Sequence, residues 1–498
     1  MLNENRSALA TVTGRCNWFR WDLALGDRAL MATAPPALAA ALLLTAAGAA
    51  LAYGPALESC ATDGLAVNPN GGWQRRLEDA RPGSTILMRG GSYTLRGRLK
   101  LPSGTAQHAI VIKPYDCERV MLTASAESAG RGHVLEPGSF VTLAGLFVES
   151  ATHESLVRIR SGRQNFVLRN NSLVGGRNDA FVISGGESIL VEGNYINSGP
   201  GQHPGITTSS GGHIFYLKSD DSGGGPSDVR IVGNQIEGSY FGDLVSGDDV
   251  FAVQAGDGIV IEGNRITNQF NIENIIDIKT RGSSSPVIFR DNYASDNFKG
   301  SKGGQDHGRP EPCIVIGDAD RSPPLRHRIE GNVFDGCPGG ALSVGGGKRT
   351  GSALIVDNLF RERSGDGSPA SGVIARSVDT EIAHNVFYRG ALTIARPGSG
   401  CGSAQMPAGL RIRDNVFYQT RIVDQTDDCP TIDYLLARNI FYNLPQGFER
   451  GRRQGNLNAD PRFRNAASGD FSLLPDSPAI GAGSDGRAIG RLSGRSPP

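Results

Sequence analysis

The sequence predicts an all-β solenoid, and three observations support this fold class. A six-residue pattern recurs ten times: an apolar residue, two variable residues, Asn, any residue and an apolar residue. Sustained helical periodicity is scarce, whereas short alternating runs that end in Gly, Asn or Asp are frequent. Glycine is abundant, with 68 of 498 residues, and is spread along the chain. A repeat of this length is typical of stacked coils.

The pattern places one Asn at the same bend of each coil. The ten residues are Asn171, Asn194, Asn234, Asn264, Asn292, Asn332, Asn358, Asn385, Asn415 and Asn439, spaced 23 to 40 residues apart. Each period has room for about three short strands and three turns. Asn tolerates left-handed backbone angles, and stacked amides hydrogen-bond from coil to coil. We therefore predict about ten or more coils joined by a ladder of Asn side chains.

This repeat resembles the right-handed parallel β-helix superfamily, which includes pectate lyases, alginate lyases and chondroitinase B. The resemblance covers roughly residues 73–483 and implies a single-stranded right-handed parallel β-helix. Trp73 to Tyr93 is similar to the opening of these proteins, where a short amphipathic helix caps the first coil. Asp470 to Gly483 is similar to their closing segment. We assign the domain to residues 53–485 and a disordered tail to residues 486–498.

Residues 1–52 are predicted to be a targeting segment. An uncharged run of sixteen residues extends from Ala37 to Ala52, slightly short of the about 20 that a membrane helix needs. It ends in a small-x-small cleavage pattern, Ala50-Leu51-Ala52. We expect export to the periplasm or the medium, and the alternative is a retained N-terminal membrane anchor.

The cysteines that follow this run agree with export. They are six in number, Cys60, Cys117, Cys313, Cys337, Cys401 and Cys429, and disulfides form in oxidising compartments. Of the fifteen pairings that six cysteines allow, we favour the sequential one. Its last two pairs are separated by 24 and 28 residues, close to the repeat length. Free buried thiols are the alternative.

The charge balance argues against two classes of partner. The chain has 50 Lys and Arg against 50 Asp and Glu, which gives no net attraction to nucleic acid or to an anionic membrane. We expect a monomer with no nucleic-acid partner, and contact with a membrane only through the N-terminal segment.

One stretch, Asn271 to Arg281, is predicted to be a strand that presents an unusual set of charges. Ile276 and Ile278 fall on one side, whereas Glu273, Asp277 and Lys279 fall on the other. Two carboxylates and an amine would thus lie on the open face of a single strand.

The first strand of each coil predicts a row of outward-facing residues. Its members are Arg160, Ser184, Lys218, Gln254, Lys279, Gly317, Gly345, Arg376 and Arg396, with Tyr216 and Asp277 in the row beside it. Stacked coils lie about 4.8 Å apart, so spaced cations could pair with carboxylates, the aromatic ring could stack on a sugar, and the glycines could admit a ring. We predict a groove for an anionic, uronate-containing polysaccharide. A solvated sheet edge is the alternative.

Residues 273–281 resemble the alginate lyase and chondroitinase B segment that carries a calcium-binding Glu and a base Lys. The resemblance implies β-elimination, with Glu273 as a Ca²⁺ ligand and Lys279 as the base that removes the C5 proton. Asp277 stands where that family usually has a neutral residue, and it is either a further ligand or a partner of Lys279.

This sequence departs from the pattern of that family at the general acid. The family's Arg-His-Gly motif is replaced here by residues 314–317. Arg281, Arg321 or His307, the last from an insertion at Asp296 to Pro312, would have to supply the proton. C5 epimerisation starts with the same proton removal.

Two alternatives remain open. Gly247 to Gln254 resembles the Gly-Asp-Asp motif of polygalacturonases, which implies hydrolysis with Asp248 and Asp249 as acid and base. The Asn-Thr-Asp and Gly-His-Gly motifs of that family are missing, and the two aspartates could equally be Ca²⁺ ligands. The second alternative is a carbohydrate-binding or structural solenoid without chemistry.

Overall fold

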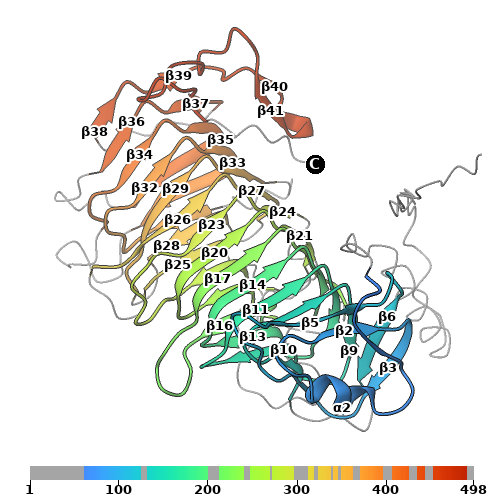
Figure 1. Cartoon of the computed structure of the whole chain (residues 1–498). Helices are drawn as coiled ribbons and strands as arrows, with labels where there is room; N and C mark the ends of the chain where they lie inside the picture. Colours follow the sequence, from blue (N-terminus) through green and yellow to red (C-terminus); the bar gives the residue numbers. More distant parts are fainter. Residues whose placement is uncertain are drawn as a thin grey trace, which may run out of the picture. The chain divides into compact units, whose positions relative to one another are not determined.

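Each coil of the chain contains three short strands, and equivalent strands of successive coils pair in parallel (Figure 1). A representative coil consists of β13 (Asp179–Ser184), β14 (Glu187–Glu192) and β15 (Tyr195–Asn197), and the next coil begins with β16 (Phe215–Lys218). The predicted three-stranded repeat is therefore confirmed, and the fold is a parallel β-helix.

The computed structural model describes residues 61–124, 132–199, 212–240, 247–269, 272–295, 312–318, 323–337, 340–345, 349–362, 371–395, 407–425, 434–443 and 452–490. The predicted targeting segment lies outside these ranges. Within them, no helix has the length and apolar character that crossing a membrane requires.

The strands form three faces. The first face contains β4 (Leu99–Lys100), β7 (His133–Glu136), β10 (Ser155–Arg160), β13, β16, β19 (Asp249–Val253), β22 (Asn274–Ile278), β25 (Ile314–Ile316), β28 (Leu342–Val344) and β31 (Ser371–Ile374). The second face contains β1 (Leu65–Val67), β2 (Thr85–Met88), β5 (Ile110–Pro114), β8 (Val141–Ala144), β11 (Gln164–Arg169), β14, β17 (Ser227–Val232), β20 (Asp257–Glu262), β23 (Ile288–Arg290), β26 (Arg326–Glu330), β29 (Ser352–Val356), β32 (Glu381–Ala383), β34 (Arg411–Arg413), β36 (Leu435–Ala437) and β38 (Arg452–Gln454).

The third face contains β3 (Gly91–Leu95), β6 (Val120–Ala124), β9 (Phe147–Ser150), β12 (Ser172–Gly175), β15, β18 (Gln235–Gly238), β21 (Arg265–Gln269), β24 (Tyr293–Ser295), β27 (Val333–Asp335), β30 (Leu359–Arg361), β37 (Ile440–Tyr442) and β39 (Leu457–Asn458). Two longer strands, β33 (Val386–Ile394) and β35 (Val416–Asp424), start in the third face and continue into the first.

The predicted Asn ladder is present and continuous. All ten residues are buried, and in each the side-chain amide donates to the side-chain oxygen of the equivalent Asn in the next coil, as from Asn171 to Asn194 at 3.0 Å. The ladder gains an eleventh member, because Asn439 donates to Asn456 at 3.1 Å. Sequence reasoning missed Asn456, since Arg453 and Asn458 occupy the apolar positions of the pattern there.

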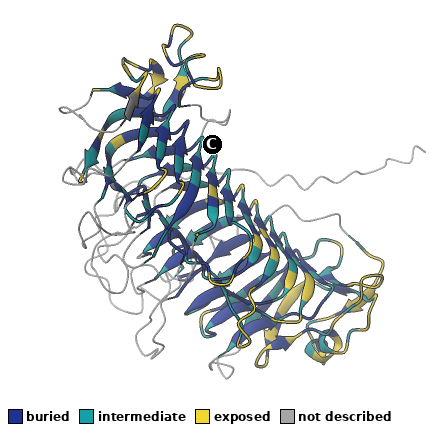
Figure 2. Ribbon diagram, turned by 90° about the vertical axis from the view of Figure 1, so that its left-hand side faces the viewer, coloured by how far each residue is buried: buried dark blue, intermediate teal, exposed yellow. Residues whose placement is uncertain are grey.

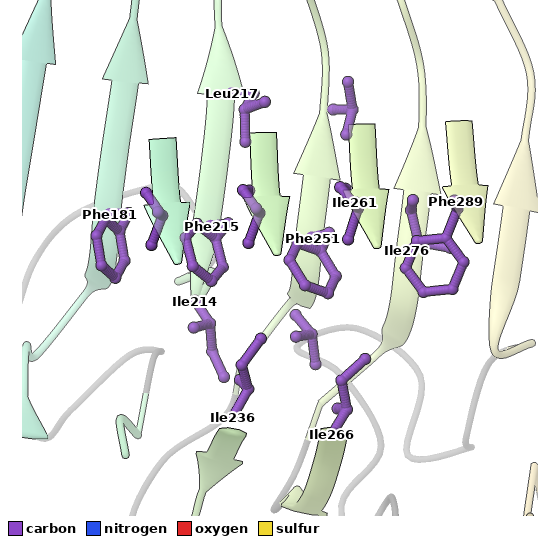
Figure 3. Close-up of a cluster of buried hydrophobic side chains, with 14 of the residues drawn as sticks. Phe181, Ile214, Phe215, Leu217, Ile236, Phe251, Ile261, Ile266, Ile276 and Phe289 are labelled. Carbon is purple, nitrogen blue, oxygen red and sulfur yellow. The ribbon is translucent and has the colours of Figure 1, made fainter. Parts of the chain in front are cut away.

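Many strand residues are buried (Figure 2). Aliphatic and aromatic side chains fill the interior (Figure 3). Figure 3 shows Phe181, Phe215 and Phe251 in equivalent positions of successive coils, with ring centroids 4.4 and 5.2 Å apart. Because these rings fill the core from the first face, the residues that alternate with them point outward.

The N-terminal end carries the predicted helix. It is α2 (Trp73–Glu78), whose Trp73 and Leu77 are buried. The Trp73 ring meets Tyr93 edge-on at a centroid distance of 5.3 Å.

The C-terminal segment folds back onto the outer side of the third face. Its β40 (Phe463–Asn465) and β41 (Asp470–Leu473) form an antiparallel hairpin, joined by the 3-10 helix η3 (Ala466–Ser468). Phe463 and Phe471 contact the outward rings of Tyr418 and Tyr388, with centroids 6.0 and 5.2 Å apart.

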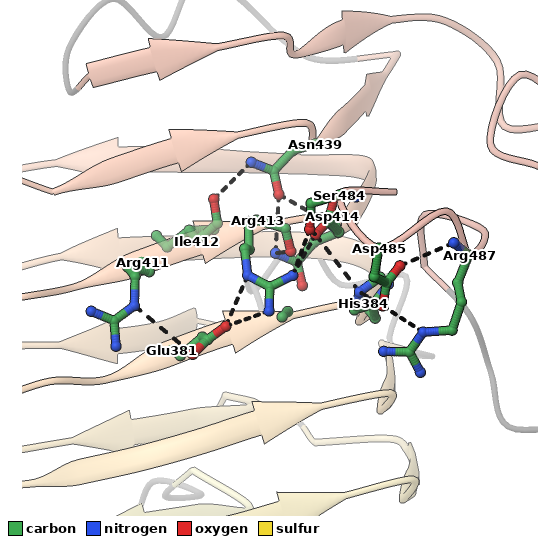
Figure 4. A network of polar contacts seen from close by, with 12 residues as sticks. Glu381, His384, Arg411, Ile412, Arg413, Asp414, Asn439, Ser484, Asp485 and Arg487 are labelled. Atoms are coloured by element: carbon green, nitrogen blue, oxygen red, sulfur yellow. Dashed lines mark hydrogen bonds and ion pairs between the residues drawn. The ribbon is translucent and has the colours of Figure 1, made fainter. Parts of the chain in front are cut away.

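A polar network fastens the chain beyond this hairpin (Figure 4). The Ser484 hydroxyl donates to Asp414 at 2.6 Å, and His384 Nε2 lies 3.6 Å from Asp414 and 3.3 Å from Asp485. Ile489 is buried. The expected disordered tail therefore does not hold for residues 486–490, because they pack against the last coils; residues 491–498 lie outside the described ranges.

One predicted disulfide is confirmed. Cys313 and Cys337 are bonded, with Cα atoms 5.7 Å apart, at one corner of two successive coils. Cys117 is also disulfide-bonded. Cys60, Cys401 and Cys429 lie outside the described residues.

Candidate functional site

Two neighbouring strands of the first face carry the candidate site. In β19 and β22, Phe251 pairs with Ile276 in the core, so Ala252 and Asp277, the next pair, point outward. Lys279 follows β22 directly, and its backbone N–H donates to the Val253 carbonyl at 2.9 Å. Asp248, Asp249, Glu273, Asp277 and Lys279, which we call the carboxylate–lysine cluster, are thus brought together as predicted.

Lys279 and Asp277 form an ion pair of unequal exposure. The Lys279 ammonium contacts Asp277 Oδ2, yet the lysine side chain is 29% exposed and the aspartate only 2%. The prediction that Asp277 lies on an open face is therefore wrong: it points outward but is covered. Among the described residues, the second oxygens of Asp277 and Asp249 have no hydrogen-bond partner.

This environment fixes the protonation of Lys279. Burial lowers the pKa of Lys279, but the Asp277 and Asp249 carboxylates raise it by more than burial lowers it. The pKa therefore stands above its ordinary value. Burial likewise raises the pKa of both aspartates, and the Asp277 charge adds to the rise at Asp249. Lys279 therefore rests as an ammonium at neutral pH.

Glu273 and Asp248 form the other pair of the cluster. Burial, a hydrogen bond with the Asp248 side chain and the Asp248 charge raise the pKa of Glu273 to about 8. Glu273 is thus a carboxylic acid at neutral pH. The backbones are linked as well, since Glu273 N–H donates to the Asp248 carbonyl at 2.5 Å.

A buried row beneath the cluster was not assigned from the sequence. His213 N–H donates to Asp179 Oδ1 at 2.9 Å, and its ring nitrogens lie 3.5 Å from Asp249 Oδ2 and 3.8 Å from Asp248 Oδ2. Burial lowers the pKa of His213 to about 4 and raises that of Asp179 to about 7. The sequence contains a pattern that could have indicated this row. Each of its members stands two residues before a core Phe: Asp179, His213 and Asp249.

Three of the predicted substrate-binding residues lie together beside the cluster. The Tyr216 hydroxyl donates to Gln254 Oε1 at 3.1 Å. Lys218 Nζ lies 4.9 Å from the centroid of the Tyr216 ring, and the His213 ring packs against the same ring at 4.5 Å.

The other predicted residues lie elsewhere. Arg160 is in the expected row but pairs with Glu136 at 3.4 Å, four strands from β22. Arg376 follows β31, three strands away on the other side. Arg281 is exposed next to the cluster, and its N–H donates to the Gln254 carbonyl at 3.0 Å. His307, Arg321 and Arg396 lie outside the described residues.

Gly317 and Gly345 of the outward-facing row do not leave open space for a ligand. A Cβ on Gly317 would lie 3.0 Å from Arg349 Cβ, and a Cβ on Gly345 would lie 2.1 Å from the Arg376 carbonyl oxygen. Both glycines therefore serve close packing, and the expectation that they admit a sugar ring is wrong. Arg349, whose charge acts on Asp277 and Lys279, was missed because it lies in a loop outside the repeat pattern.

The described residues do not form a metal centre: no three His, Cys, Asp or Glu side chains in them are placed to hold one ion. Asp277 is engaged with Lys279, and Glu273 with Asp248. Calcium binding stays a prediction.

Comparison with known proteins bears on the fold. The family model "Right handed beta helix region" matches residues 155–360, which include the cluster. The chain is similar to an alginate lyase from Paenibacillus sp. str. FPU-7, at 15% identity over 67% of this chain and 97% of that chain, with a TM-score of 0.43. It is also similar to a mannuronic acid specific polysaccharide family 6 lyase from human gut microbiota, at 14% identity over 76% of this chain and 86% of that chain, with a TM-score of 0.48.

No curated protein sequence matches the chain. At these identities the likeness to the two lyases concerns the fold alone. The family match and the parallel stacked coils identify the fold as a right-handed parallel β-helix.

Proposed function

We propose that this chain acts on an anionic, uronate-containing polysaccharide and cleaves it by β-elimination, with Lys279 as the base. One observation carries the proposal: Lys279 is the amine of the cluster, it reaches solvent, and its carboxylate partners are buried behind it. A base must touch the C–H bond that it breaks, whereas groups that tune its pKa need not.

The chemistry follows from this placement. The Lys279 amine takes the proton from C5 of the uronate, the electrons of that bond form the C4=C5 double bond, and the C4–O bond breaks. The negative charge that develops at the uronate carboxylate needs nearby cations. Lys218, Arg281 and Arg349 lie near the cluster and can supply them.

The raised pKa of Lys279 constrains the reaction. Because the amine rests as an ammonium, only a small fraction is free to act as a base at neutral pH. We therefore expect the rate of elimination to rise with pH through the neutral and alkaline range, up to the pKa of Lys279.

Hydrolysis is a second candidate, and one observation favours it. Glu273 has a pKa of about 8, so it carries a proton at neutral pH as a general acid must. It would protonate the leaving oxygen while Asp248 or Asp249 activates water. This route needs no free amine.

Export is part of the proposal. The Cys313–Cys337 bond supports it, because disulfides persist outside the reducing cytoplasm. Retention of the N-terminal segment as an anchor stays a prediction.

A panel of polymers tests the function. The protein would be incubated with alginate, pectate, chondroitin sulfate and hyaluronan, each with calcium and with a chelator. We expect ultraviolet absorbance from the unsaturated product on at least one polymer. New reducing ends without absorbance would indicate hydrolysis instead, and neither signal on any polymer would contradict both readings and favour a binding or structural solenoid.

A further inference from the structure

An elimination also requires a proton for the leaving oxygen, and the cluster's amine cannot supply it while acting as the base. We propose that Tyr216 is the general acid that protonates this oxygen. The inference rests on the proposed function and adds to it a catalytic role that neither the repeat pattern nor the lyase-like segment predicts.

The first argument is position. Tyr216 pairs with Ala252 in the next strand and Ala252 pairs with Asp277, so Tyr216 and Asp277 lie on the same outer row, two strands apart. The small Ala252 side chain separates them. Gln254, whose Oε1 accepts from the Tyr216 hydroxyl at 3.1 Å, directly follows β19, as Lys279 directly follows β22. Gln254 therefore lies in the coil between those of Tyr216 and Lys279.

The second argument is orientation. The Lys218 ammonium and the His213 ring both contact the aromatic ring of Tyr216, at 4.9 and 4.5 Å from its centroid. These contacts occupy the ring that was expected to stack on a sugar. The hydroxyl, which donates a hydrogen bond to Gln254, is then the group left for chemistry, and a side chain fixed in this way loses little freedom when substrate binds.

The third argument is protonation. Burial, with the Asp179 and Asp248 charges, raises the pKa of Tyr216, while Lys279 and Arg281 oppose the rise. The phenol therefore keeps its proton at neutral pH, as a general acid must. The nearby Lys218 cation favours the phenolate that forms once the proton has left.

The complete step balances as follows. The C5 proton goes to the Lys279 amine, and the C5–H electrons pass first into the uronate carboxyl group, from which they can return to C5. When they instead form the C4=C5 double bond, the C4–O bond breaks and its electrons stay with the leaving oxygen. The Tyr216 hydroxyl proton goes to that oxygen. The phenolate then regains a proton from water, and the Lys279 ammonium loses one to water.

Tyr216→Phe in the full chain tests the proposal, on the polymer that the wild-type protein cleaves. The variant keeps the ring contacts and loses only the hydroxyl. Removal of a general acid typically costs about 10²- to 10⁴-fold in rate, and we expect cleavage to fall by this factor. Exchange of the C5 proton with deuterium in heavy water, followed by NMR or mass spectrometry, should continue because Lys279 is intact.

Tyr293→Phe is the matched control, because Tyr293 also lies under a cation, Arg265 at 4.7 Å, but on the third face. It should cleave at the wild-type rate. Cleavage by Tyr216→Phe within a few-fold of wild type would overturn the proposal, and so would the loss of cleavage and exchange together, since that would mark a structural role. Absence of elimination by the wild-type protein would instead refute the proposed function itself.

Discussion

Asp277 lies in β22 and Lys279 directly follows this strand, yet the two side chains differ strongly in their exposure to solvent. Asp277 is covered, with one carboxylate oxygen lacking a hydrogen-bond partner among the described residues, whereas the Lys279 side chain spans the distance from this buried carboxylate to the surface. The aspartate is therefore placed to set the proton affinity of the amine and not to bind a polymer.

Replacement of Asp277 by Asn tests this division of roles. Burial lowers the pKa of Lys279, and the Asp277 charge is foremost among the influences that raise it, so Asp277→Asn should lower that pKa. If the free amine is the base, kcat/KM rises with pH through the neutral and alkaline range up to the pKa of Lys279. In Asp277→Asn this rising limb of the pH profile should move to lower pH. Asp228→Asn, an exposed change on the second face, is the control and should leave the limb in place. A limb that stays in place or moves to higher pH in Asp277→Asn would contradict Lys279 as the base.

The alternation of residues along the strand predicted the direction of the Asp277 and Lys279 side chains but not how far each is buried. Strand periodicity assigns Asp277 and Lys279 to the same side of β22, which is correct. The burial of Asp277 comes from the folded coils around it, and the charge of Arg349, which lies far along the chain and outside the repeat, also acts on it. His213 and Asp179 were missed for a related reason: their polar positions face inward, where the pattern predicts apolar residues.

At the scale of elements, the Asn ladder links the coils through the corner between the second and third faces. Asn332 accepts from Asn292 and donates to Asn358 and to the Phe289 carbonyl. It is fully buried. Every amide of the ladder thus depends on its neighbours above and below.

Asn332→Ala should therefore destabilise the protein more than Asn456→Ala. The first change leaves buried groups unpaired in two neighbouring coils, at a cost of about 1–3 kcal/mol for each group. The second removes only the last and partly exposed member, which accepts from Asn439. Urea denaturation of both variants, followed by circular dichroism, measures the difference. Equal losses would show that the ladder does not act as a continuous unit.

The whole molecule combines a repeat and an N-terminal helix that were predicted well with a closing segment and a site that were predicted less well. Ten equivalent Asn residues indicated the coils, since each occupies the same bend and makes the same bonds. The closing segment was expected only by resemblance. Its contacts with Tyr388, Tyr418 and Asp414 join residues far apart in sequence, and no local pattern reports such contacts.

The candidate site shows the same limit. The strands that carry it, and the proximity of Asp248, Asp249, Glu273, Asp277 and Lys279, followed from the register of the repeat. The partition into an ion pair, a carboxyl pair and a buried histidine depends on burial and on side chains from adjacent coils, which the sequence does not encode at any fixed spacing.

The most direct measurement of the central claim is the ultraviolet assay of elimination with Lys279→Arg and Lys279→Ala beside the wild-type protein. Arg keeps the positive charge but cannot lose its proton in this pH range, so it can replace a cation but not a base. We expect both variants to lose elimination, with Lys279→Arg no better than Lys279→Ala at any pH. Retention of activity in Lys279→Arg would contradict Lys279 as the base and leave it as a cation that binds the uronate carboxylate.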